Sequence, residues 1–311
     1  MRFASPASLA LLTLLSGCSG CNKPQTGDPL PSGTTSSSAV AAAKVPDAAV
    51  PHKPGGEAGV DLTHARTATP TTKGLPMIAI TPKEIRFVGT TKEPIPMPAP
   101  VSWYAGMPLS VKGNKQGLFI VPIDSWLREL KKDAGKDGPR DLSLVIDNSI
   151  SYRIVTEVLY TGAQAGFDRM HLVALTPDDT YGELVLEMAG AKPGASAPPF
   201  ASLMVLAEGI SIKTEYNSVN TGCRGFGAGL AFPRVNGEVD TVGLSSCMDR
   251  ITPEAGSSPD VVVGGSYETP FGEVLRVIDG VRGRTTKTEV HFGIQMGPPP
   301  MGPPPGINAP R

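Results

Sequence analysis

The feature that most constrains the fold is a pattern that occurs twice in the chain, 119 residues apart. Residues 152–160 (YRIVTEVLY) and residues 271–279 (FGEVLRVID) both place apolar side chains at helical spacing. Each segment lies between two apolar stretches typical of strands: 142–147 and 170–175 around the first, 260–263 and 290–294 around the second. Because this period is far longer than that of solenoid repeats, it predicts two duplicated domains and not a stacked array.

Two further elements precede the pattern in each copy. Residues 77–88 and 203–212 are typical of β-hairpins. Asp124 and Ser151 are predicted to cap the two helices of the first copy. The first helix of each copy carries an apolar stripe: Trp126, Leu127 and Leu130 in one, Leu244, Cys247, Met248 and Ile251 in the other. We therefore expect an α+β protein of two small domains, each a mixed β-sheet with two helices packed on one face, in β-β-α-β-α-β order.

The domain boundaries follow from changes in composition. Residues 189–200, rich in Ala, Gly and Pro, are predicted to link a first domain of residues 75–188 to a second domain of residues 201–296. Residues 297–311 carry two Gly-Pro-Pro-Pro runs typical of polyproline structure. We predict a disordered tail there, either as a solvated end or as a segment that docks into an aromatic groove.

The chain begins with features of an exported protein. Arg2 and the apolar run 9–15 are typical of a signal peptide, and the run is too short to span a bilayer. The last residue of this run and the three that follow it, Leu15-Ser16-Gly17-Cys18, resemble a bacterial lipobox. This resemblance implies cleavage after residue 17 and acylation of Cys18 by diacylglycerol and palmitate; the alternative is an ordinary signal peptide with an incidental cysteine. Ser19 favours the outer membrane of a Gram-negative envelope over the inner membrane.

Residues 18–74 are predicted to be a disordered tether that separates the lipid from the folded part. No aromatic residue occurs between Phe3 and Phe87, and Ser, Thr, Ala and Pro dominate the intervening chain. Such a composition cannot bury enough apolar surface to offset the entropy lost on ordering. His52 and His64 lie in this segment, and we expect both to be solvated.

Four cysteines occur in a chain that is predicted to be exported, where disulfides persist. Cys18 is assigned to the lipid, and Cys21 is expected to be unpaired or linked to a partner chain. Cys223 and Cys247 are left, both in the second copy. We predict that they form a disulfide, which would close a loop of about 25 residues and stabilise the fold by roughly 3 kcal/mol. The alternative is two buried free thiols.

The remaining polar residues do not indicate catalysis, a cofactor or a metal. His171 and His291 occupy equivalent predicted strands, but no cluster of further ligands accompanies either one. Asp147 is expected to serve in capping or in a turn, or else to contact a partner. The Gly-rich run 222–229 lacks the Gly-Lys-Ser/Thr ending of a phosphate-binding loop. From these residues we predict a non-enzymatic protein. The formal net charge of −1 also argues against nucleic-acid binding.

The repeated segments resemble the periplasmic domain of the ExbD/TolR biopolymer-transport family. That domain has a strand ending in an acid, a Pro-Tyr-Gly-like helix start, a Val-rich helix and a short strand. In the first copy the matching pieces are Val145-Ile146-Asp147, Ser151-Tyr152, 155–159, Ala165-Gly166-Phe167 and Leu172-Val173. The second copy matches through Thr269-Pro270-Phe271-Gly272-Glu273-Val274 and Val277-Ile278-Asp279. The resemblance covers residues 76–176 and 202–296.

The resemblance implies a binding role in the cell envelope. Motor members of the family carry a transmembrane helix with an essential acid, and this sequence has no apolar stretch long enough to match it, so proton conduction is not carried over. We expect a lipid-anchored, periplasm-facing accessory component that binds ExbB/ExbD-type or TolQ/TolR-type proteins, or itself. The alternative is a structural lipoprotein associated with peptidoglycan. Residues 170–175 and 290–294 are expected to be edge strands, open to strand addition by a partner.

Overall fold

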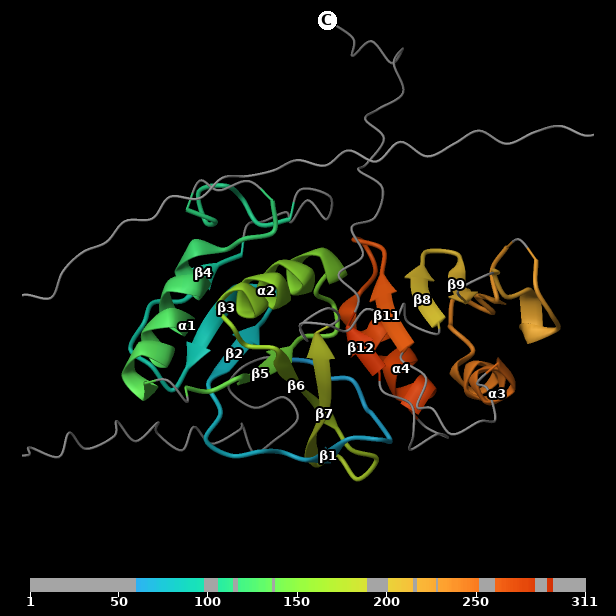
Figure 1. The fold of residues 1–311 in the computed structure, drawn as a ribbon, viewed down its shortest axis with the longest axis horizontal. Coiled ribbons are helices and arrows are strands. Elements are labelled where there is room, and N and C mark those ends of the chain that lie inside the picture. The colour runs from blue at the N-terminus through green and yellow to red at the C-terminus, as the bar shows by residue number, and fades with distance from the viewer. Residues whose placement is uncertain are drawn as a thin grey trace, which may run out of the picture. The chain divides into compact units, whose positions relative to one another are not determined.

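The computed structural model of the protein describes residues 60–97, 106–113, 117–135, 138–188, 201–214, 217–227, 229–251, 261–282 and 290–292 (Figure 1). The predicted signal peptide, Cys18, Cys21, the linker 189–200 and the tail 297–311 lie outside these residues, and so does most of the tether. The side chain of His291 also lies outside the description. The fold that is described is α+β, with four α-helices and a mixed sheet among these residues.

The first half of the described chain, residues 60–188, contains seven strands and two helices. They are β1 (Thr69–Pro70), β2 (Met77–Ile80), β3 (Glu84–Val88), β4 (Ile95–Pro96), α1 (Val121–Ala134), β5 (Asp141–Ile146), α2 (Tyr152–Gln164), β6 (Arg169–Leu175) and β7 (Tyr181–Met188). The sequence pattern did not predict β7. Asp124 lies in the first turn of α1 and bonds Arg128 at 2.8 Å, whereas Ile120 occupies the N-cap position, so the capping role predicted for Asp124 is wrong.

The second half, residues 201–292, repeats much of this order. Its elements are β8 (Ala201–Leu206), β9 (Gly209–Thr214), the 3₁₀-helix η1 (Thr221–Cys223), β10 (Phe232–Pro233), α3 (Thr241–Ile251), β11 (Val261–Gly265), α4 (Phe271–Arg282) and β12 (Val290–Phe292). β5 ends at Ile146 and β11 at Gly265, and α2 begins at Tyr152 and α4 at Phe271. Both pairs of positions are separated by the 119 residues of the sequence repeat.

The strands of both halves belong to one continuous sheet. Its order is β10-β9-β8-β11-β12-β7-β6-β5-β2-β3-β4, and β1 pairs with β7. β7 joins the halves, because it runs antiparallel to β6 and parallel to β12. The expectation that residues 170–175 and 290–294 form open edges is therefore wrong, since β6 and β12 both lie inside the sheet.

The outermost strands of the sheet are short and contain proline. β4 ends at Pro96 at one edge and β10 at Pro233 at the other. Proline has no backbone N–H to donate, and short edge strands give an incoming strand little to pair with. The described sheet is thus poorly suited to the strand addition that the sequence suggested.

Alternate residues of the strands face two different apolar layers. One face packs against the helices in a single cluster that includes Leu144 and Leu186 of the first half and Val205 and Val263 of the second. On the opposite face, a smaller cluster contains Met77, Ala79, Val145, Val173 and Leu175 together with Leu62. Leu62 belongs to the segment 60–74, which we call the strap.

The strap lies where the sequence predicted the end of the tether. Leu62 is 8% exposed and Ala65 is fully buried. The strap also pairs with the sheet, because Ala65 N donates to Leu175 O at 2.7 Å and Leu175 N donates to Thr63 O at 2.9 Å. Residues 60–74, which the sequence assigned to the disordered tether, are therefore part of the folded structure.

Candidate functional site

The loops before α2 and α4 meet at the junction of the two halves and exchange hydrogen bonds. Tyr152 N at the start of α2 donates to Thr269 O at 2.8 Å, and Phe271 N at the start of α4 donates to Ile150 O at 2.7 Å. Phe271 is the repeat equivalent of Tyr152, and Thr269 is the repeat equivalent of Ile150, each 119 residues later. The two contacts are therefore equivalent under the repeat. Such reciprocity is the mark of an isologous, two-fold interface, here within one chain.

A second pair of contacts follows the same rule. Arg153 N donates to Tyr267 O at 3.2 Å, and Gly272 N donates to Asn148 O at 3.1 Å. The first N–H groups of both helices are therefore satisfied by carbonyls of the other half. This explains why Ser151, which holds the predicted N-cap position of α2, makes no side-chain cap, and why its buried Oγ has no partner among the described residues.

Side chains reinforce the junction. The Arg153 guanidinium lies over the Tyr267 ring, 4.5 Å from its centre, and its Nε bonds Glu157 at 3.1 Å. Tyr152 is fully buried, and burial raises the pKa of its phenol. Arg282 of α4 donates to the carbonyl of Val185 in β7, and burial lowers the pKa of this guanidinium. The halves are thus joined by a polar network as well as by the sheet.

The strap crosses the junction and is held by three buried carboxylates. Asp147 accepts the backbone N–H of Asp61 at 2.8 Å, Asp279 accepts that of Thr67 at 2.8 Å, and Glu183 accepts that of Thr72 at 3.0 Å. The three acids are 5%, 5% and 3% exposed. Asp147 and Glu183 belong to the first half and Asp279 to the second, so the strap ties both halves together. Charged acceptors make stronger hydrogen bonds than neutral ones.

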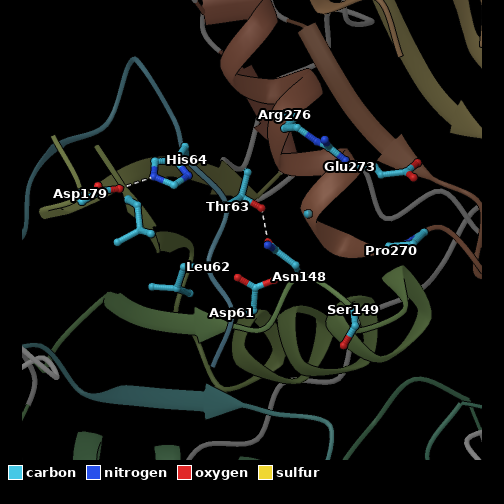
Figure 2. Close-up of a pocket in the computed structure, with 12 residues that line it drawn as sticks. Asp61, Leu62, Thr63, His64, Asn148, Ser149, Asp179, Pro270, Glu273 and Arg276 are labelled. Carbon is cyan, nitrogen blue, oxygen red and sulfur yellow. Dashed lines mark hydrogen bonds and ion pairs between the residues drawn. The ribbon is translucent and has the colours of Figure 1, made fainter. Parts of the chain in front are cut away.

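A cavity of about 790 Å³ opens at this junction (Figure 2). Four separate segments line it: the strap, the β5–α2 loop, the β6–β7 turn and the start of α4. The lining residues are Asp61, Leu62, Thr63, His64, Asn148, Ser149, Leu175, Asp179, Pro270, Gly272, Glu273 and Arg276. Its volume falls in the range of small-molecule binding sites.

Gly272 permits the close approach at the centre of this site. A Cβ at this position would lie 2.7 Å from Asn148 Oδ1 and 2.9 Å from Thr63 Oγ1, which is closer than real contacts allow. Thr63 Oγ1 in turn donates to Asn148 Oδ1. Gly272, which belongs to the segment that resembles the ExbD/TolR family, is therefore favoured here because a side chain would collide with Asn148 and Thr63.

Two polar side chains of the cavity, Ser149 and His64, have partners within the protein. Ser149 Oγ donates to Asp147 Oδ1 at 2.6 Å, so this hydroxyl is engaged in the turn chemistry that the sequence predicted for Asp147. His64 Nε2 lies 2.6 Å from Asp179 Oδ1 and its side chain is 57% exposed, so His64 has a partner that the sequence did not suggest. Both pairings therefore engage these side chains within the protein itself.

His171 is buried between two carboxylates on the strap side of the sheet. Its Nδ1 lies 2.9 Å from Glu183 Oε1 and its Nε2 lies 2.9 Å from Asp141 Oδ1. The two ring nitrogens point in different directions, so these acids do not converge on a common point. Among the described residues, no group of three or more His, Cys, Asp or Glu side chains could hold a metal ion.

The structure joins Cys223 and Cys247 in a disulfide, with Cα atoms 5.5 Å apart. This is the pair that the sequence predicts. The bond fixes the Gly-rich loop at η1 to α3, away from the cavity residues. In the part of the chain that is described, no helix is long and apolar enough to cross a membrane.

Comparison of the chain with protein-family models, with curated proteins and with solved structures finds no match.

Proposed function

We propose that the protein is a non-enzymatic binding component of the Gram-negative cell envelope, lipidated at Cys18 and facing the periplasm from the outer membrane. Its two halves are tandem ExbD/TolR-like modules of β-β-α-β-α-β order. In this proposal it serves as an accessory component of a trans-envelope, energy-transducing system for biopolymer transport. It contributes no proton-conducting helix of its own.

The observation that carries this proposal is the reciprocal exchange between the loops at residues 148–153 and 267–272. Each contact in one direction has its counterpart 119 residues away. This arrangement supports an origin in a module that pairs with a second copy of itself, as the ExbD/TolR resemblance implies. Because the second copy is supplied in the same chain, the proposed partner is a different envelope protein, and self-association through this surface is no longer needed.

The anchor is tested on the full-length protein in its own envelope. The intact mass of the purified protein should correspond to a chain that starts at Cys18 and carries acyl groups. Cys18→Ala should abolish labelling with a palmitate analogue, whereas Cys21→Ala, three residues away, should leave it unchanged. An unmodified protein that begins at another residue would disprove lipidation.

The partner is tested by crosslinking the full-length protein in intact cells and identifying what is captured. The proposal expects an ExbB/ExbD-type or TolQ/TolR-type component. In parallel, the solubilised protein is sedimented with purified cell-wall sacculi, where only weak binding is expected. Strong sacculus binding without a crosslinked motor component would overturn the proposal in favour of a peptidoglycan-associated structural lipoprotein.

A further inference from the structure

The junction cavity contains two opposite charges that the protein itself leaves unpaired. Five titratable side chains line it, and three of them are engaged. His64 pairs with Asp179 at 2.6 Å, and Glu273 is held by both terminal nitrogens of Arg234. The other two are Asp61 and Arg276. Among the described residues, no hydrogen bond or ion pair engages the Asp61 carboxylate or the Arg276 guanidinium, although Asp61 N binds Asp147.

These two groups come from different walls. In Figure 2, Asp61 lies beside Asn148 on the side of the first half, and Arg276 projects from α4 on the opposite side. Thr63 and Asn148 lie between them in this view, and Leu62, Leu175 and Pro270 supply apolar surface elsewhere in the lining. The cavity therefore presents an exposed carboxylate on one side and an exposed guanidinium on the other, with polar and apolar residues in the rest of its lining.

From this arrangement we propose that the cavity binds a short peptide or amino acid with both a free ammonium and a free carboxylate group. The ligand's carboxylate pairs with Arg276, whose planar fork matches two carboxylate oxygens. The ligand's ammonium pairs with Asp61, and small side chains rest against the apolar residues. This ligand site is independent of the envelope partner proposed above.

Ligands of one charge fit the cavity less well. A phosphate would find Arg276 but also three carboxylates in the lining. The N-terminus of α4 offers it no donors, because Phe271 N and Gly272 N already bind Ile150 O and Asn148 O. A purely cationic ligand would be repelled by Arg276. A zwitterion satisfies both unpaired groups at once.

The test uses trialanine as the probe, together with N-acetyl-trialanine and trialanine amide, which each lack one charge. Binding to the full-length protein in detergent is followed by saturation-transfer NMR on the peptide. Each cap should weaken binding to the wild-type protein by about threefold to fivefold, the scale of an exposed ion pair.

The variants make the assignment specific. In Asp61→Asn the acetyl cap should no longer matter while the amide cap still does, and in Arg276→Gln the reverse should hold. Asp133→Asn and Arg224→Gln, at exposed positions outside the cavity, should behave like wild type. No binding of trialanine, or equal effects of both caps in all proteins, would overturn the proposal. Partner crosslinking is measured separately, so its result does not decide this one.

Discussion

The carboxylate of Asp279 in α4 accepts both the backbone N–H and the hydroxyl of Thr67 in the strap, each at 2.8 Å and across 212 residues of sequence. Asp279 is 5% exposed, so water cannot replace these bonds cheaply. This contact fastens the strap to the second half, while Asp147 and Glu183 fasten it to the first.

We expect Asp279→Ala to lower the free energy of unfolding by about 1–3 kcal/mol, because two partly buried donors of Thr67 lose their acceptor. Denaturant titration measures the change, and hydrogen exchange should show faster exchange of the Thr67 amide. Asp133→Ala, at an exposed position on α1, is the control and should change stability by less than about 0.5 kcal/mol. Equal effects of the two substitutions would contradict the role assigned to Asp279.

Removal of the whole strap should have a larger effect than removal of the chain before it. A protein that starts at Val60 keeps Leu62 and Ala65, and should unfold at the same denaturant concentration as the longer chain. A protein that starts at Leu75 uncovers the cluster around Val145 and Val173 and leaves three buried carboxylates without backbone donors. It should be less stable by several kcal/mol and bind a hydrophobic dye. Equal stability of the two truncated proteins would show that the strap is dispensable.

The junction predicts opposite results for two neighbouring substitutions. Ser151→Ala removes a buried hydroxyl that has no described partner, so stability should stay the same or rise slightly. Gly272→Ala forces a methyl group against Asn148 and Thr63 and should cost about 1–3 kcal/mol. Thermal unfolding of both variants checks this, and a Gly272→Ala protein as stable as wild type would refute the close approach.

Alkaline pH should reveal the burial of Tyr152. Burial raises the pKa of this phenol, so above about pH 10 the folded state keeps a proton that the unfolded state has lost. The free energy of unfolding must then fall as pH rises, by up to about 1.4 kcal/mol per pH unit from this group. Tyr152→Phe should lose this part of the slope. Parallel pH profiles for the two proteins would contradict the prediction.

The disulfide should stabilise the second half by roughly 3 kcal/mol, as expected from the loop it closes. Cys223→Ala with Cys247→Ala should show this loss in denaturant titrations, and non-reducing peptide maps of the wild type should contain the linked pair. Free labelling of both thiols in the folded protein would contradict the bond.

The repeat allowed much of the local structure to be predicted. The positions of β5, α2, β11 and α4 follow from apolar periodicity, and the pairing of the two cysteines follows from the export signal. β7 was missed because the predicted β-β-α-β-α-β order ends each copy with the strand that follows its second helix. The same omission made β6 and β12 look like edges, although β7 lies between them.

The strap and the cavity could not be read from the sequence for a different reason. The strap has few apolar residues, and it is held by backbone N–H groups that bond carboxylates up to 212 residues away. Such bonds leave no periodic signal, since every residue except proline has the same N–H group. The cavity combines four segments that are far apart in the sequence. Which of its charges stay unpaired depends on two contacts that form only in the folded protein, His64 with Asp179 and Arg234 with Glu273.

The exchange of bonds between residues 148–153 and 267–272 takes place inside one polypeptide, and this changes how it responds to dilution. Two separate subunits part when their concentration drops below the dissociation constant, whereas joined partners keep a fixed effective concentration. The paired state is therefore independent of how much protein the cell makes. Because the two halves are separate stretches of one chain, each half can also acquire its own sequence features. Cys223 and Cys247 lie in the second half, and the strap with its anchor Glu183 belongs to the first.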